Sequence, residues 1–456
     1  MAKDTETMLD NAIHILHEYP LCDRCLGRLF AWLGTGTTNE HRGDSIKLVL
    51  FMIGDELLRK GERSPAEDYI RTLAGNGMMS SARRLAKKEK ITFQLIEKCH
   101  LCTIDQSIFD RIPKIVQHIE EKLEGFEFDT FLVGSIPQPR LVENQDEICA
   151  KFNLLNSEPL KSAFNRELGK AVYDKLAKEV EFEKPDIVII YNMEKEKIRL
   201  QVNPIFIFGR YLKLKRGIPQ SRWDCGRCRG RGCEECKGTG RRYPDSVSEY
   251  IGLPALKITK ATRFKVHAAG REDIDALMLG EGRPFVLELS EPKKRDLNLV
   301  ELERIINQEA DGKVEVHDLE FSERSRAQHL KKDASENIKE YVAIIATEEK
   351  VSDDLLREAE KLFTEIDIEQ RTPTRVAHRR SDLVRVKHIY QVRLKRDKGY
   401  KLRGSFKVQG GTYIKELISG DKGRTRPSLA EVLRTPCVCT ELNVTAIYTE
   451  KPDHNA

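Results

Sequence analysis

The sequence contains no apolar run that approaches the roughly 18–20 residues needed to cross a lipid bilayer. Its first ten residues, MAKDTETMLD, also lack the basic start and the apolar segment of a secretory signal. Neither a long repeat nor a low-complexity tail is present. These absences exclude a transmembrane helix and predict a cytoplasmic protein with no membrane among its partners.

A strong excess of one charge is also missing, since 78 Lys and Arg oppose 73 Asp and Glu, which leaves a net charge of +5 over 456 residues. A hydrophobic content of 39% and a charged content of 33% are typical of a globular chain and exclude wholesale disorder. At roughly 150 residues per domain, this length favours about three domains, each able to bury its own core.

Two segments nevertheless concentrate basic residues. Eleven Lys and Arg oppose three acids between Arg210 and Arg242, and twelve oppose two between Arg371 and Gly404. Such local surpluses, interleaved with aromatic residues and glycine, are typical of surfaces that bind polyanions. One run alone is more often a solvated basic face, but two runs beside other motifs favour RNA as the partner.

The eleven cysteines do not indicate a disulfide framework, because small secreted scaffolds are far shorter than this chain. The segment CGRCRGRGCEECKGTG repeats the pattern Cys-x-x-Cys-x-Gly-x-Gly twice, and its glycines let backbone amides turn toward the sulfurs. A redox-active dithiol is the alternative, but such sites normally occur singly. We predict a structural zinc site formed by Cys225, Cys228, Cys233 and Cys236.

A second possible zinc site combines two distant Cys-x-x-Cys pairs, LCDRCLGR and KCHLC. A metal there would tie the N-terminus to the end of the first domain, and His100 is a possible substitute ligand. The predicted ligands are Cys22, Cys25, Cys99 and Cys102. The unpaired cysteines are interpreted as ordinary thiols: Cys149, Cys437 and Cys439.

The segment GREDIDALMLGEGRPFVLEL carries Asp273 and Asp275, whose spacing puts both carboxylates on one face if the segment is a strand. The pair could be an exposed acidic pair balanced by Arg271 and Arg283, a Mg²⁺-binding Asp-x-Asp of a transferase, or part of a catalytic site. Two later segments, KEYVAII at 339–345 and GGTYIKEL at 410–417, favour the catalytic interpretation.

In this order the three segments resemble the motifs of the pseudouridine synthase superfamily. Ile274, Asp275 and Gly280 match the first motif, and Lys339 with Tyr341 matches the second. The third motif is matched by Gly411, Thr412, Tyr413, Ile414 and Lys415. Three longer stretches (204–220, 270–285 and 370–380) resemble the THUMP-domain tRNA pseudouridine synthases of archaea and eukaryotes, which act on the TΨC arm. The doubled cysteine motif is similar to the archaeal branch.

This resemblance implies an α+β protein. Residues 1–120 would form a mostly helical zinc-binding region, and 121–245 a THUMP-type RNA-binding domain that ends in the four-cysteine knuckle. Residues 246–456 would form the catalytic domain on a mixed, largely antiparallel sheet. Strands are expected at 131–135, 282–289, 341–347 and 387–396, an amphipathic helix at 160–180, and a hairpin at 185–202.

The implied reaction breaks the C1′–N1 bond of uridine, rotates the uracil and joins C1′ to C5, so it needs no organic cofactor. Asp275 would act as the nucleophile, kept ionised by Lys415, while Tyr341 stacks on the uracil and Tyr413 lines the pocket. The target base must be flipped out of its stack. The implied targets are uridine 55 and its neighbour, uridine 54, in the conventional tRNA numbering; whether one or both react, and whether the carboxylate attacks sugar or base, stays open.

The basic residues are expected to hold tRNA at two places, the acceptor end and the opened TΨC arm. The first group is Arg210, Lys213 and Arg216; the second is Arg371, Arg375, His378, Arg379 and Arg380. No protein partner is implied. Two other functions compete with this one: a non-catalytic, zinc-containing RNA-binding or RNA-chaperone protein, and a metal-dependent transferase that uses Asp273 and Asp275.

Overall fold

The computed structural model describes residues 7–333 and 336–448. Its contacts divide the chain into two compact units, residues 1–203 and residues 204–456. Within the described ranges, no helix is both long enough and apolar enough to span a membrane.

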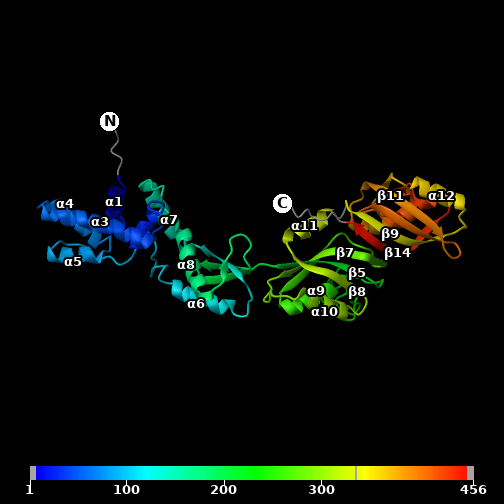
Figure 1. Ribbon diagram of the computed structural model, residues 1–456, viewed down its shortest axis with the longest axis horizontal. Coiled ribbons are helices and arrows are strands. Elements are labelled where there is room, and N and C mark those ends of the chain that lie inside the picture. Colours follow the sequence, from blue (N-terminus) through cyan, green and yellow to red (C-terminus); the bar gives the residue numbers. More distant parts are fainter. Residues whose placement is uncertain (1–6, 334–335, 449–456) are drawn as a thin grey trace, which may run out of the picture. The chain divides into compact units, whose positions relative to one another are not determined.

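The first unit begins with helices and continues into a small sheet (Figure 1). Its helices are α1 (Met8–Glu18), α2 (Asp23–Leu29), α3 (Asn39–Arg59), α4 (Arg63–Ala74), α5 (Ser80–Lys88), α6 (Ile112–Leu123), α7 (Pro139–Lys151) and α8 (Leu160–Leu176). Its strands are β1 (Thr130–Ile136), β2 (Glu179–Val180), β3 (Ile187–Asn192) and β4 (Lys197–Val202), in the sheet order β2-β1-β3-β4.

This unit contains the strand, the helix and the hairpin that the sequence predicts. In β1 and β3 every second residue is buried, because one face of the sheet packs on the core with α8. The helix ends at Leu176 rather than at 180, since Ala177 adopts the left-handed conformation and the chain then forms β2. The division expected at residue 120 falls within α6, whose apolar face contacts α8, so it does not separate two units.

The second unit is built on a ten-stranded sheet of order β13-β10-β11-β12-β9-β14-β7-β5-β8, with β6 paired to β7. Its strands are β5 (Ile205–Lys213), β6 (Arg263–Ala268), β7 (Ala276–Ser290), β8 (Val314–Ser322), β9 (Ile338–Thr347), β10 (Ile366–Arg371), β11 (Val384–Arg396), β12 (Lys401–Gln409), β13 (Thr425–Arg426) and β14 (Cys437–Tyr448). Among the described strands of this sheet, β14 and β7 pair in parallel and the other pairs are antiparallel. The expected α+β class and the mixed, largely antiparallel sheet are confirmed.

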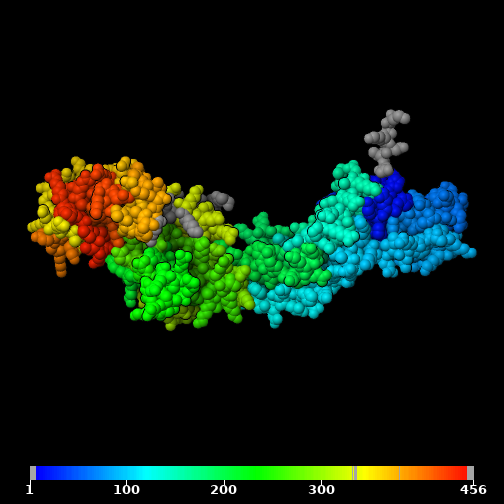
Figure 2. Space-filling model, turned by 180° about the vertical axis from the view of Figure 1, so that it is seen from behind, coloured from blue at the N-terminus to red at the C-terminus, as the bar shows by residue number. Residues whose placement is uncertain are grey.

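Helices cover both faces of the β5–β7 part of this sheet, as Figure 1 shows. Ile205 and Ile207 pack in the core with α9 (Val247–Thr259) and α10 (Leu299–Ala310), whereas Phe206 and Phe208 pack on the opposite face near α11 (Arg324–Asp333). The remaining helical elements are α12 (Asp353–Leu362), η1 (Thr374–Arg379), α13 (Ile414–Ser419), η2 (Asp421–Gly423) and α14 (Leu429–Val432). In Figure 2 the orange and red segments, which contain β11, β12 and β14, lie next to each other on the viewed face.

The boundary expected after residue 245 requires correction to 203/204. Strand β5 is hydrogen-bonded to β7 along one edge and to β8 along the other, so it belongs inside the second sheet. The four-cysteine segment at 225–236 follows β5 and precedes α9, and it therefore belongs to the second unit rather than closing the first.

Candidate active site and metal centres

A cavity of 680 Å³ in the second unit collects the residues of all three sequence motifs. Asp273 and Asp275 enter it from the turn that precedes β7, and Tyr341 enters from β9. Tyr413 and Lys415 come from the start of α13. The fold thus unites the motifs in one cavity, although Asp275 and Lys415 are 140 positions apart in the chain.

The two aspartates lie in a turn and not on a strand, which corrects the expectation from their spacing. The amide of Ala276 donates to the carbonyl of Asp273 at 3.0 Å, and β7 begins only at Ala276. This turn, residues 273–275, is called the aspartate turn below. The side chain of Asp275 is 67% exposed, so its carboxylate is open to an entering substrate.

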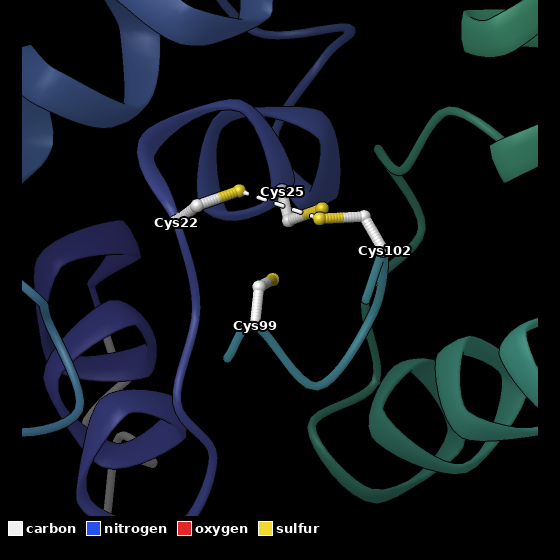
Figure 3. Close-up of side chains that lie close together, drawn as sticks. All are labelled: Cys22, Cys25, Cys99 and Cys102. Atoms are coloured by element: carbon white, nitrogen blue, oxygen red, sulfur yellow. Dashed lines mark hydrogen bonds between the residues drawn. The ribbon is translucent and has the colours of Figure 1, made fainter. Parts of the chain in front are cut away.

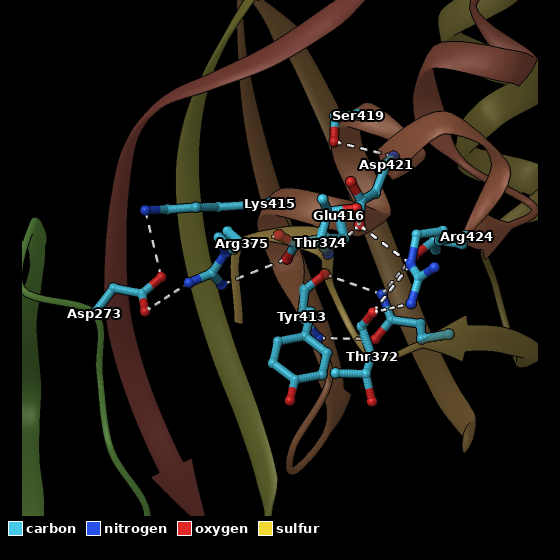
Figure 4. A network of polar contacts seen from close by, with 12 residues as sticks. Asp273, Thr372, Thr374, Arg375, Tyr413, Lys415, Glu416, Ser419, Asp421 and Arg424 are labelled. Atoms are coloured by element: carbon cyan, nitrogen blue, oxygen red, sulfur yellow. Dashed lines mark hydrogen bonds and ion pairs between the residues drawn. The ribbon is translucent and has the colours of Figure 1, made fainter. Parts of the chain in front are cut away.

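Lys415 forms the closest ion pair of the cavity. Its Nζ donates to Oδ1 and Oδ2 of Asp275 at 2.8 and 2.7 Å and lies 3.3 Å from Oδ2 of Asp273. Arg375 holds Asp273 from the other side, with Nη1 3.1 Å from Oδ1, and its Nε donates to Glu416 at 2.8 Å. Figure 4 shows Lys415 and Arg375 converging on Asp273. Asp273 is thus shared between two cations, while both carboxylate oxygens of Asp275 accept hydrogen bonds from Lys415.

The ion pair keeps the Asp275 carboxylate charged. Desolvation works to raise the pKa of Asp275, but the hydrogen bonds and the positive charge of Lys415, with a smaller contribution from Arg375, lower that pKa below its usual value. For Lys415, desolvation works to lower the pKa, yet Asp275 and Asp273 raise it. Both partners are therefore ionised at neutral pH.

Two tyrosines line the same cavity. Burial raises the pKa of Tyr341 to about 12, so its ring presents a neutral phenol. Tyr413 is held through its backbone, since its amide donates to Gln370 Oε1 at 2.8 Å and its carbonyl accepts from Gln370 Nε2 at 3.0 Å. Its hydroxyl accepts a hydrogen bond from Arg380 Nη1 at 2.8 Å, which brings one expected RNA contact to the cavity.

The cavity residues that were not predicted as site residues include Trp223, Glu272, Arg283 and Lys339. Arg283 does not balance the aspartates, because its Nε lies 2.9 Å from Glu272 Oε2 and both side chains are almost fully buried. Desolvation and the nearby charges of Arg283 and Lys387 lower the pKa of Lys339 to about 7. Of these four residues, only Lys339 lies in a sequence motif that could have identified it.

Lys213 is corrected from an RNA-binding residue to a support of the aspartate turn, which Arg216 also contacts. Lys213 is 0% exposed, and its Nζ donates to the carbonyls of Ile218, Asp273 and Ile274 at 3.0, 3.0 and 3.1 Å. A side chain so enclosed cannot reach a phosphate. Arg216 Nη1 donates to the carbonyls of Asp275 at 2.6 Å and Leu442 at 2.9 Å. Period-two alternation along β5 places Lys213 on the face of Ile205 and Ile207, a signal that the sequence already contained.

The other expected RNA contacts occupy different surroundings. Arg210 donates weakly to the carbonyl of Gly282, at 3.3 Å. Arg371 is exposed and pairs with Asp382 at 2.7 Å. His378 is exposed on η1, and the side chain of Arg379 lies outside the described residues. Arg375 and Arg380 are the two of this group that line the cavity.

The cysteines of each predicted zinc site come together, with all four sulfurs of a set within 4.8 Å of one another. In the second unit the Sγ–Sγ distances are 3.8 Å for Cys225–Cys233, 3.8 Å for Cys228–Cys236 and 3.6 Å for Cys233–Cys236. Zn–S bonds of about 2.3 Å in a tetrahedron require sulfurs about 3.8 Å apart. Amides of Gly232 and Gly240 donate to Cys228 Sγ and Cys236 Sγ at 3.2 and 3.1 Å, as the glycines predict.

The first unit holds the other set, shown in Figure 3. Cys22 and Cys25 come from the start of α2, while Cys99 and Cys102 come from the loop before α6. Cys22 Sγ lies 3.8 Å from Cys102 Sγ, and three of the four residues are buried. His100 is not part of the set. Both donor sets fit a metal ion that prefers tetrahedral thiolate coordination.

The chain is similar to known protein families. The family model described as "Pus10, C-terminal" matches residues 206–448, and the model "Pus10 THUMP domain, archaeal" matches residues 115–192. The class is therefore that of pseudouridine synthases with a THUMP domain.

The relatives extend this likeness over nearly the whole chain. A protein named "tRNA pseudouridine synthase Pus10" from Methanothrix thermoacetophila is 40% identical over 437 residues, 96% of this chain and 94% of the relative. Its namesake from Methanocaldococcus jannaschii is 41% identical over 441 residues, 95% of this chain and 93% of the relative. The chain belongs to the Pus10 family. In a solved Cbf5-Nop10-Gar1 complex, 50% of one chain matches 54% of this one, with 18% identity and a TM-score of 0.30.

Proposed function

We propose that this enzyme converts uridine 55 of tRNA, and uridine 54 beside it, to pseudouridine in the TΨC arm. The observation that carries the proposal is the Asp275–Lys415 ion pair, which lies in one cavity with Tyr341 and Tyr413. A charged carboxylate open to the cavity is the group that this isomerisation needs.

In the proposed mechanism, Asp275 acts as the nucleophile and Lys415 keeps it ionised and oriented. Tyr341 stacks on the uracil near C5, where a proton must leave, and its raised pKa keeps the phenol neutral. No electron donor or group donor takes part, so we propose no organic cofactor.

The target uridine is stacked within the folded arm, so we propose that it is flipped into the cavity at a cost of a few kcal/mol. Arg380 lies beside Tyr413, and Arg375 lies beside Asp273, so both are near the cavity and can contact phosphates of the opened strand. We propose that Arg371 and His378, which are both exposed, contact further phosphates of this strand. We propose that the THUMP domain binds the acceptor end of the tRNA. If so, a tRNA that lacks its single-stranded acceptor tail should bind the protein with lower affinity.

The two four-cysteine sets are proposed to hold structural zinc, about two ions per chain. With four cysteines each, the sites leave no open position for water, so the metal would cross-link the chain and take no part in the reaction. The first would join α2 to the segment before α6, and the second would close the loop between β5 and α9.

Tritium release from tRNA labelled at uridine C5 tests the proposed activity. Tritium release that continues when Mg²⁺ is removed supports the isomerase. Tritium release that stops when Mg²⁺ is removed indicates the metal-dependent transferase. A folded protein that binds tRNA but releases no tritium from any tRNA would be a non-catalytic, zinc-containing RNA-binding protein.

A further inference from the structure

The side chain of Trp223 lies at the active-site cavity, although no sequence motif assigns it a role. It is half-buried in the loop between β5 and α9 and lines the same 680 Å³ cavity as Asp275 and Tyr413. Nothing in the proposed reaction requires an indole at this place. Its surroundings therefore decide what it can bind.

Two arginines lie against this indole. The guanidinium of Arg271 is 5.2 Å from the ring centroid and that of Arg242 is 5.5 Å away. Tyr243 packs edge-on against the same indole, with the ring centroids 5.7 Å apart. Both arginines are exposed. An aromatic ring combined with exposed cations is the arrangement with which proteins hold single-stranded nucleic acid, since bases stack on the ring and cations attract phosphates.

The four-cysteine loop fixes this arrangement. The amide of Cys225 donates to the carbonyl of Gly240 at 2.8 Å, and the amide of Arg242 donates to the carbonyl of Trp223 at 2.9 Å. An antiparallel bridge joins Asp224 to Arg241 between these two bonds. The two ends of the loop are thus paired, which places Trp223 beside Arg242 at the cavity. The preorganised ring loses little conformational entropy when a base stacks on it.

The cavity has room for more than the target base. Its volume of 680 Å³ equals that of roughly twenty water molecules in the liquid, at about 30 Å³ each. Uracil is a single six-membered ring and fills only part of this volume. We propose that Trp223, with Arg242 and Arg271, is the stacking site for an unpaired RNA base adjacent to the flipped uridine. This inference rests on the proposed function, because that function supplies the opened RNA strand.

Intrinsic fluorescence tests the stacking without turnover. The chain has two tryptophans, so Trp32→Phe leaves Trp223 as the sole indole. Titrating this full-length, zinc-loaded variant with single-stranded oligouridine should quench its fluorescence saturably, because a stacked base quenches an indole. Inorganic polyphosphate, which has the charge but no bases, should not quench it. Absence of saturable quenching by RNA, or equal quenching by polyphosphate, overturns the proposal.

Kinetics give the second test. Trp223→Ala should raise the KM for tRNA about 5- to 150-fold, the loss expected for one base stack, with a smaller change in kcat. Trp223→Phe keeps a stacking ring and should restore most of the affinity, with zinc content unchanged in both variants. A wild-type KM in Trp223→Ala, or equal impairment in both variants, refutes the stacking. If the wild-type protein releases no tritium, the proposed function fails, while the fluorescence titration still decides whether RNA stacks on Trp223.

Discussion

Replacing Lys213 by methionine should damage catalysis while leaving RNA binding intact. The ammonium of Lys213 has three N–H donors and contacts three carbonyls, those of Ile218, Asp273 and Ile274. Two of these carbonyls belong to the aspartate turn. Methionine has a similar length but no donor, so Lys213→Met removes this anchor with little change in volume.

The expected cost to global stability is small. The carbonyls of Asp273 and Ile274 each keep a second bond, from the amides of Ala276 and Gly217 at 3.0 and 2.9 Å. The carbonyl of Ile218 loses the hydrogen bond from Lys213 Nζ, which costs about 1–3 kcal/mol of folding free energy. Desolvation lowers the pKa of Lys213 from 10.5 to about 8, so removing the buried charge recovers about 3 kcal/mol. These two effects nearly cancel, which predicts a Tm within several degrees of wild type.

The catalytic effect should be much larger, because a displacement of a reacting group by about 1 Å can lower the rate about 10²-fold. In the tritium-release assay, Lys213→Met should lower kcat by about that factor and change the KM for tRNA less than about twofold. Lys215→Met is the matched control, since Lys215 is exposed on the same segment and carries the same charge. A folded Lys213→Met variant with normal kcat, or one with a raised KM and a weaker salt dependence, would refute this reasoning.

The other predictions concern the ion pair and the cysteines. Asp275→Asn should reduce turnover more than about 10³-fold with near-normal tRNA affinity, whereas Asp273→Asn should be milder; the reverse order in the same assay would show that the nucleophile is misassigned. Lys415→Met removes the hydrogen bonds that lower the pKa of Asp275, so desolvation should raise that pKa and move the acid limb of the kcat–pH profile upward; an unmoved limb contradicts this. Metal analysis should find about two zinc ions per chain, and Cys22→Ser or Cys225→Ser should each lose about one and lower the Tm. A zinc-free protein that stays folded and fully active would exclude structural zinc.

Sequence reasoning was most successful where function demands particular side chains at short spacing. The two Cys-x-x-Cys pairs at 225–236 identify a four-sulfur set because each pair reaches a metal from a single turn. The parts of β7 and β9 at 282–289 and 341–347 were predicted because they are rich in apolar residues. It was least successful with basic residues, because a count of charges does not distinguish a buried lysine from an exposed one.

The domain boundary shows a second reason for failure. Strand β5 is separated from β7 by more than sixty residues along the chain, and its edge pairing with β8 spans a longer interval still. Pairing over such distances leaves no local mark in the sequence. The basic and cysteine-rich stretch after β5 was therefore assigned to the end of the THUMP-type domain, although the chain had already entered the second sheet.

By itself the sequence determined which chemical groups this protein has: two sets of thiolates, an aspartate pair, two tyrosines and a lysine in family motifs. Only the tertiary structure decided how they are used. It brings Lys415 within 2.7 Å of Asp275, divides Asp273 between Lys415 and Arg375, buries Lys213 beneath the aspartate turn and brings Trp223 to the cavity. The physical reason is that ionisation, burial and hydrogen bonding depend on neighbours in space, and strand pairing and loop closure choose those neighbours from residues that are far apart in the chain.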